Sequence, residues 1–403
     1  EQFPTSSYND DAMYEMARAK ERLGSGDEAI ELYNSLMTKH PESILVRKSL
    51  LQLGLIYYNK NENETSLTYY KKVVDNYPNT EESKAALVGI KNNYIDMNNV
   101  DAYFDYSGTA GGKQGQVSTS AQDSIFYMAA ERNYMAGESG AEAKFDEYLT
   151  RFPNGSFKLN ASFYLAEICY SKGQYSRSLE LYETVTSMGD NIFSEQALLK
   201  AGELSFNAQK YDTSLDYFQR LGKVATTKWN ILKSRAGVMR SFFKLSDYAN
   251  SISSAQLVMK TENVTEAITR EANYIQATSY YKQSQPDEAL KFYTLLANDT
   301  KLAEGAEAKY NKAKILFEKN LLDQSEAEIL DFINKNTPHQ YWLAQSFILL
   351  TDIHLARKDV FQARHTLQSL IDNYTNQTDG VLTLAKEKMQ VVESLGNQNI
   401  IEE

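Results

Sequence analysis

The chain has 403 residues, of which 42% are hydrophobic, and its 6 prolines and 19 glycines leave few turn formers for a β-rich fold. Its formal net charge is -11, from 42 basic and 53 acidic residues, and Lys and Arg never stand more than two in a row, so nucleic acid is not the expected partner. One cysteine, Cys169, excludes a disulfide framework and a multi-cysteine metal site, and the longest apolar run, 125–130, is far shorter than the ~20 residues that cross a bilayer.

Three stretches in the first part of the chain share one pattern, in which a small residue stands twelve positions before a proline. These stretches are 25–41, 63–78 and 140–153. The small residues are Ala29, Ser66 and Ala141, and the aromatic residues Tyr33, Tyr70 and Phe145 follow four positions later. A small side chain lets two helices approach closely, so each stretch is predicted to be the second helix of a helical hairpin.

The same small residue, called the anchor below, recurs along the chain at intervals of 36 to 39 residues. The anchors are Ala29, Ser66, Ala102, Ala141, Ser178, Ser214, Ser251, Ala289, Ser325 and Ala363. Twelve residues before the anchor another small residue usually stands, at Ala17, Gly54, Ala166, Gly202, Ala277 and Ala313. So regular a period predicts an array of about ten helical hairpins.

The repeated pattern resembles the tetratricopeptide repeat, which has a small residue and Tyr in its first helix, then a small residue and an aromatic residue in its second helix, then Pro. Residues 50–78 match this pattern best, and the resemblance covers nearly the whole chain. The period exceeds the usual ~34 residues, and most repeats after residue 153 lack the proline. The resemblance implies an all-α fold, a right-handed superhelical solenoid of antiparallel helix pairs whose first helices line a concave surface. It also implies a non-enzymatic role in binding proteins or peptides.

The third repeat is irregular, because its second helix runs into a segment with four glycines in thirteen residues, 108–120. Gly and Ser at this density do not hold a helix, so 107–120 is predicted to be a loop or hinge. A phosphate-binding loop is excluded, because Gln114 follows Gly112 and Lys113 where Ser or Thr is required. Repeats 1–3 are then assigned to 1–106 and repeats 4–10 to 121–377.

Residues 122–170 are similar in style to the long tetratricopeptide proteins of Gram-negative envelopes, such as the lipoprotein of the outer-membrane assembly machine and the Tol-Pal coordinator. The shared feature is a turn that begins with an aromatic residue, Pro and Asn, here in RFPNGS (151–156) and YPNT (77–80). This resemblance implies a periplasmic or outer-membrane-associated place in an envelope assembly.

The last segment, 378–403, is predicted to be a capping helix and a tail. Five apolar residues fall on one helical face, namely Val381, Leu384, Ala385, Met389 and Val392. Solenoids need such a helix to cover the last exposed part of the core.

Polar groups that could catalyse a reaction or bind a metal are sparse. The four histidines are His40, His339, His354 and His365. His354 and His365 are eleven residues apart across a turn, which is not a metal-ligand spacing, and His354 fills a position held by Tyr in other repeats. Cys169 has no His within ten residues and fits a buried, inert thiol. We therefore expect no catalytic residue, no metal, no cofactor and no enzymatic activity.

Aromatic side chains are the informative feature, with 28 Tyr and 17 Phe in the chain. Positions eight and fifteen before the anchor lie on one face of the first helix and predict two aromatic rows on the concave surface. The candidate partner-binding residues are Tyr58, Phe163, Tyr170, Phe206, Phe243, Tyr274, Tyr281, Tyr310 and Phe317. Two interpretations stay open: the rings pack between adjacent repeats, or they line a groove for a peptide, to which Tyr offers a large rigid contact with a hydrogen-bonding tip.

The leading hypothesis is a scaffold that binds a protein or peptide in an envelope assembly. One alternative is a glycan- or peptidoglycan-binding module, because aromatic platforms also stack on sugars. The other is a cytoplasmic regulatory adaptor. Neither nucleic acid nor a transmembrane segment is expected in any of the three.

Overall fold

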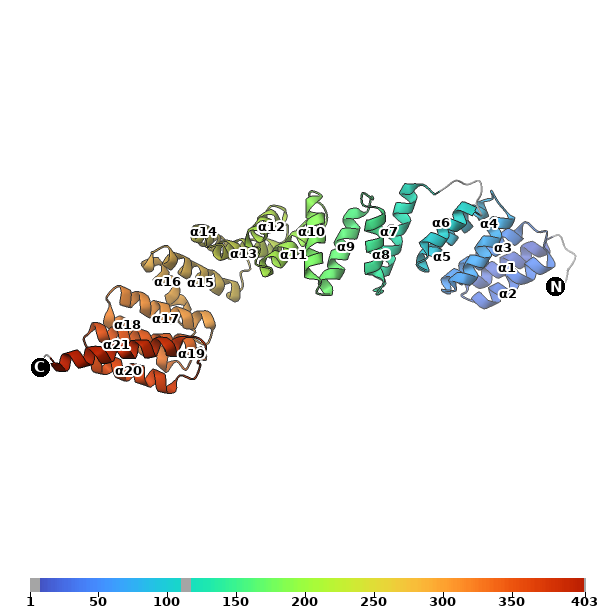
Figure 1. Cartoon of the computed structure of the whole chain (residues 1–403). Coiled ribbons are helices and arrows are strands. Elements are labelled where there is room, and N and C mark those ends of the chain that lie inside the picture. The colour runs from blue at the N-terminus through green and yellow to red at the C-terminus, as the bar shows by residue number, and fades with distance from the viewer. Residues whose placement is uncertain (1–7, 110–116, 402–403) are drawn as a thin grey trace. The chain divides into compact units, whose positions relative to one another are not determined.

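The computed structural model describes residues 8–109 and 117–401, and within these ranges every regular element is an α-helix (Figure 1). The helices form two compact units, Glu1–Met188 and Gly189–Glu403. The first unit holds α1 (Asn9–Arg22), α2 (Gly26–Lys39), α3 (Leu45–Asn59), α4 (Asn63–Asn76), α5 (Glu81–Asp96), α6 (Val100–Thr109), α7 (Thr119–Met135), α8 (Ala141–Arg151), α9 (Lys158–Ser171) and α10 (Tyr175–Ser187). The second unit holds α11 (Ser194–Asn207), α12 (Tyr211–Val224), α13 (Lys228–Lys244), α14 (Tyr248–Met259), α15 (Glu266–Lys282), α16 (Pro286–Leu296), α17 (Ala303–Glu318), α18 (Leu322–Asn334), α19 (Gln340–Ala356), α20 (Val360–Asn373) and α21 (Val381–Ile401). The predicted all-α fold class is confirmed.

Each hairpin reverses direction through a residue in the left-handed backbone region just after its first helix. Behind α11, for example, Gln209 has a φ of 60°, and the N–H of Lys210 donates to the carbonyl of Ser205 at 2.9 Å. The equivalent residues are Gly24, Asn61, Asn98, Gly137, Gly173, Gln209, Ser246, Ser284, Asn320 and Lys358. Gly and Asn tolerate this conformation best, and the hydrogen bonds satisfy carbonyl groups that the ended helix leaves open. The second helix therefore returns antiparallel to the first after a turn of only a few residues.

The anchors lie where the two helices of a hairpin touch. All of them are buried except Ala102, which is half-buried. Where the anchor is Ser, its hydroxyl usually donates to the carbonyl group twelve residues earlier: Ser66 to Gly54 (2.7 Å), Ser178 to Ala166 (2.9 Å), Ser214 to Gly202 (2.9 Å) and Ser325 to Ala313 (2.7 Å). A buried hydroxyl needs such a partner, and Ala needs none, so the two residue types can alternate at this position.

Two aromatic rings, each four residues after an anchor, lie between glycines of neighbouring first helices. A Cβ built on Gly54 or Gly89 would come within 2.6 Å or 2.4 Å of the Tyr70 ring. The Phe218 ring stands in the same relation to Gly202 and Gly237, with distances of 3.0 Å and 2.3 Å. Glycine at these places lets a large ring pack directly on the helix backbone and ties one repeat to the next.

Most of the predicted hinge, residues 110–116, lies outside the described residues. On either side of it the side chains share one core. The Phe104 and Phe126 rings stack at 5.7 Å, and Arg151 of α8 donates to Asp101 of α6 at 3.0 Å. The division into two compact units falls between Met188 and Gly189.

The last helix, α21, packs on α19 and α20 through four of the five apolar residues expected on its inner face. Val381, Ala385, Met389 and Val392 are buried, whereas Leu384 is 39% exposed. The prediction was wrong for Leu384, because this residue lies at the edge of the apolar face of α21 and is not part of the core that α21 shares with α19 and α20. None of the helices in the described residues is long and apolar enough to span a membrane.

Candidate functional site

The first helices of successive repeats pack against one another in the second unit. Contacts join α11 to α13, α13 to α15, α17 to α19 and α19 to α21, and no pair of second helices packs to a comparable extent among the described residues. The link from α15 to α17 is made by side-chain hydrogen bonds from Tyr274 to Glu307 and from Tyr281 to Glu318. The odd-numbered helices of this unit therefore share one side, which we call the first-helix face. The predicted aromatic rows lie on these helices.

All six predicted aromatic residues of the second unit are half-buried, and several touch an aromatic neighbour. The residues are Phe206, Phe243, Tyr274, Tyr281, Tyr310 and Phe317. The Phe243 ring on α13 meets the Tyr274 ring on α15 edge to face, with centroids 6.4 Å apart. The Tyr310 ring on α17 lies 5.5 Å from the Trp342 ring on α19. Ring contacts thus link adjacent first helices and leave part of each ring open to solvent.

Tyrosine hydroxyls on this face donate to carboxylates of the next first helix. The Tyr274 hydroxyl lies 3.1 Å from both carboxylate oxygens of Glu307, and the Tyr281 hydroxyl lies 2.8 Å from Glu318. Burial, together with these neighbouring carboxylates, raises the pKa of Tyr274 and of Tyr281 far above the usual value. Both phenols therefore stay protonated at neutral pH and hold their rings in fixed positions.

Ion pairs also join the first helices. Arg240 of α13 makes a two-pronged contact with Glu271 of α15, at 2.7 Å and 2.6 Å, which raises the pKa of the guanidinium further. Lys233 of α13 pairs with Glu203 of α11 at 3.3 Å. Lys388 of α21 pairs with Asp352 of α19. Three carboxylates on this face, Glu203, Glu271 and Asp352, thus have a basic partner on an adjacent helix of the same face.

The three predicted residues of the first unit differ in exposure. The Tyr58 hydroxyl donates to Asp96 at 2.5 Å, and the Tyr170 ring packs on Tyr175 with centroids 5.6 Å apart. Phe163 is only 5% exposed, because its ring packs on Tyr164 and Tyr182. Phe163 therefore offers little surface to a partner in this arrangement.

Sequence reasoning missed two aromatic contacts on first helices. The rings of Tyr134 on α7 and Tyr164 on α9 lie 4.9 Å apart, and Trp342 on α19 covers Tyr310. Tyr134 and Tyr164 each lie one residue after a predicted row position. Allowing aromatic residues one position to either side of the rows would therefore have found them. Trp342 has no counterpart in the period and gives no such signal.

The groups considered for catalysis or metal binding include Cys169, His339 and His40, and each is held by burial or by a local contact. Cys169 is fully buried, and burial raises the pKa of its thiol. The His339 ring contacts the carbonyl of Lys301 at 3.0 Å, and the His40 ring contacts the Asn9 amide at 3.4 Å. No group of three or more His, Cys, Asp or Glu side chains in the described ranges could hold a metal ion.

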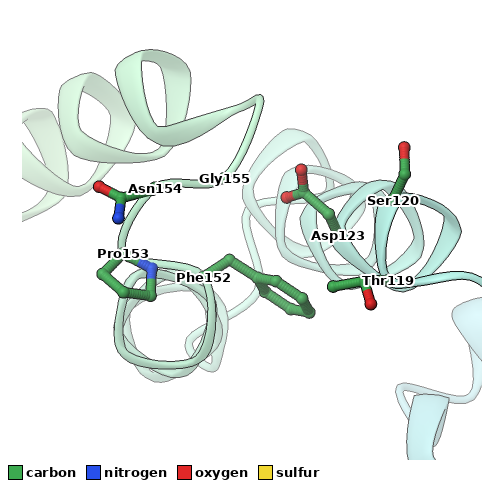
Figure 2. A pocket seen from close by; sticks show the side chains of 7 residues that line it. All are labelled: Thr119, Ser120, Asp123, Phe152, Pro153, Asn154 and Gly155. Atoms are coloured by element: carbon green, nitrogen blue, oxygen red, sulfur yellow. The ribbon is translucent and has the colours of Figure 1, made fainter.

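A surface cavity of about 270 Å³ lies between the start of α7 and the turn from α8 to α9 (Figure 2). Its acidic group, Asp123, accepts from the Tyr148 hydroxyl at 2.5 Å and from the Ser156 N–H at 2.7 Å. Burial alone raises the pKa of Asp123, but these hydrogen bonds outweigh burial and hold it below the usual value. A Cβ on Gly155 would lie 2.5 Å from the Tyr148 hydroxyl. These contacts fix the RFPNGS turn and leave little free polar chemistry in the cavity.

Comparison with known proteins points to one family. A family profile described as tetratricopeptide repeat matches residues 11–43, 48–80, 196–224 and 340–376, and a second profile of the same description matches 274–340. Among solved structures, a tetratricopeptide repeat protein from Parabacteroides merdae is 13% identical, with 68% of this chain and 100% of that chain covered and a TM-score of 0.36. The protein YrrB is 15% identical, with 51% of this chain and 97% of that chain covered and a TM-score of 0.38. Yeast Tom70 is 13% identical, with 97% of this chain and 96% of that chain covered and a TM-score of 0.37. No curated protein matches the chain in sequence.

Proposed function

Because this chain is a tetratricopeptide repeat protein, and such repeats mediate protein–protein or peptide binding, we propose that it is a non-enzymatic scaffold that binds a protein or peptide on the first-helix face of its second unit. The observation that carries the proposal is the regular spacing of half-buried aromatic rings from α11 to α17. Tyr is enriched where proteins bind one another, because it combines a large apolar ring with a polar tip.

The rings on this face are held in place before any partner arrives. The hydroxyls of Tyr274 and Tyr281 are anchored on Glu307 and Glu318, and Phe243 packs against the Tyr274 ring. A side chain that is already ordered loses little conformational entropy when a partner covers it. Packing between repeats and partner binding are therefore compatible roles for the same rings.

The test compares the double variant Tyr274→Ala with Tyr281→Ala to a control on the second helices. The control, Leu257→Ala with Leu295→Ala, removes two side chains that are 47% and 58% exposed on α14 and α16. Partners recovered with the intact chain from envelope and soluble fractions are titrated against each variant, with circular dichroism and thermal melting as checks of folding. We expect the face variant to bind at least about tenfold more weakly and the control to bind normally. Unchanged binding by a folded face variant contradicts the proposal.

We further propose that the partner belongs to a bacterial envelope assembly, with the protein in the periplasm or at the outer membrane. Support comes from the resemblance in style of the RFPNGS and YPNT turns to those of envelope repeat proteins. The test is fractionation of the native full-length product, with protease access in intact and permeabilised cells. Recovery in the cytoplasm alone contradicts this location, and saturable binding of cell-wall fragments would instead favour a glycan ligand.

A further inference from the structure

Glu307 on α17 is a carboxylate of the first-helix face that has no basic partner among the described residues. Among the described residues no Lys, Arg or His forms an ion pair with it, and its hydrogen-bond donor is the neutral hydroxyl of Tyr274. The charged group that acts on it is the carboxylate of Glu304, one turn earlier on α17. Glu307 therefore stands on this face as a half-buried negative charge that the chain itself does not neutralise.

The neighbouring repeats show what a neutralised position looks like. Glu271 on α15 has both oxygens engaged by Arg240, and Asp352 on α19 is engaged by Lys388. On α17 itself, Glu318 lies within 4.0 Å of Lys314. Three other carboxylates near it thus have a basic partner, whereas the donor to Glu307 is a tyrosine hydroxyl.

The surroundings of Glu307 suit a cationic side chain with an apolar stem. Burial and the negative charge of Glu304 raise the pKa of Glu307 although the Tyr274 hydroxyl acts in the opposite direction. A carboxylate has about four acceptor positions, so one hydroxyl leaves room for further donors. The Tyr274 hydroxyl contacts Glu307, the Tyr274 ring meets the Phe243 ring edge to face, and Tyr310 follows Glu307 one turn later on α17. Lys and Arg stems lie readily along such aromatic surface.

We propose that the segment bound on the first-helix face presents a lysine or arginine side chain to Glu307, with the stem of that side chain lying on the Tyr274 ring. This proposal rests on the proposed function and names the chemistry of the partner. A metal ion does not fit, because it needs several converging ligands and none of the described groups of His, Cys, Asp or Glu provides them. The formal net charge of -11 favours approach of a basic partner as well.

The experiment uses the whole chain and a library of random linear peptides displayed on phage. Peptides that bind the intact chain are retained only if they fail to bind the Tyr274→Ala, Tyr281→Ala variant. Selected peptides are then synthesised with each basic residue and with norleucine in its place. Their affinities are measured for the intact chain, for Glu307→Gln and for Glu288→Gln, a control on α16 that removes the same charge where it pairs with Lys291 at 2.6 Å.

We expect the selected peptides to share one position enriched in Lys or Arg. Their affinity should fall about tenfold or more for Glu307→Gln and should be unchanged for Glu288→Gln. Replacing the basic residue with norleucine should lower the affinity of the peptide for the intact chain by the same factor. It should not lower the affinity for Glu307→Gln any further. A Lys→Glu peptide should regain affinity on Glu307→Lys, which is an outcome that loss of folding cannot produce.

Two results overturn the proposal in distinguishable ways. Selected peptides that lack an enriched basic position, or that bind Glu307→Gln normally, contradict the assignment of a basic side chain and leave the peptide-binding face intact. Recovery of no peptide that depends on Tyr274 and Tyr281 contradicts the proposed function, and the assignment at Glu307 fails with it.

Discussion

Replacing Gly237 with Ala tests how tightly the rings between adjacent repeats are packed. The added Cβ would lie 2.3 Å from atoms at the root of the Phe218 ring, which cannot swing aside as a flexible chain end would. Overpacking of this kind costs about 1–3 kcal/mol, whereas Ala in place of Gly within a helix gains about 1 kcal/mol. The closeness of the contact favours the upper part of that range, so we expect a net loss of about 2 kcal/mol of unfolding free energy.

Two other glycines, Gly202 and Gly108, leave more room for an added Cβ than Gly237 does. At Gly202 the same ring lies 3.0 Å from the added Cβ and is met at its far edge, and at Gly108 on α6 nothing lies within 4 Å. Gly108→Ala should be neutral or slightly stabilising, Gly202→Ala should lose less than Gly237→Ala, and the order should follow the distances. Because repeat arrays can open locally, urea unfolding is combined with amide hydrogen exchange in α12 and α13. The packing argument is refuted if Gly237→Ala is as stable as Gly108→Ala.

Three further outcomes follow from buried polar groups. Ser214→Ala should lower the free energy of unfolding in urea by about 1 kcal/mol, because it removes the hydrogen bond from the Ser214 hydroxyl to the Gly202 carbonyl. An unchanged free energy of unfolding would show that this hydrogen bond does not contribute to stability. Asp123 has a lowered pKa in the folded chain, so the stability that its carboxylate contributes is present above about pH 4 and is lost as the pH falls through the pKa of the folded state. The difference in unfolding free energy between the intact chain and Asp123→Asn should therefore shrink in acid. A difference that does not change with pH would contradict the lowered pKa. Cys169 is fully buried with a raised thiol pKa, so a thiol reagent at pH 8 should react only after unfolding, and rapid reaction of the native chain would be inconsistent with this.

The fold was predictable because one position per repeat carries most of the geometric constraint. An anchor such as Ser214 must be small, since the first helix passes directly over it, and the resulting period is visible without any structure. The turns are less visible. Gln209 and Lys358 adopt the left-handed conformation as Gly173 does, because the helix-ending hydrogen bonds impose it, and neither residue type signals such a turn.

The candidate site was predictable only in its aromatic half. The spacing of Tyr274 and Tyr281 follows from the helical period, so their helix and side could be inferred from the sequence. Their carboxylate partners could not, because Glu307 lies 33 residues after Tyr274 and Glu318 lies 37 residues after Tyr281. The offset changes with the local stacking of the repeats, so no fixed spacing marks a residue as the partner.

The unneutralised charge at Glu307 connects stability with the proposed binding. The pKa of this carboxyl is raised in the folded chain above its unfolded value, so its ionisation at neutral pH lowers the stability of the fold. Glu307→Gln keeps an acceptor for Tyr274 and removes that charge, so the free chain should melt at a higher temperature at pH 7, with the gain disappearing in acid where Glu307 is protonated. If the same substitution weakens binding of a basic peptide, the side chain reduces stability and contributes to recognition, as preorganised sites commonly do. If it instead lowers the melting temperature at pH 7, Glu307 stabilises the packing of α15 on α17, and its lack of a basic partner has a structural cause.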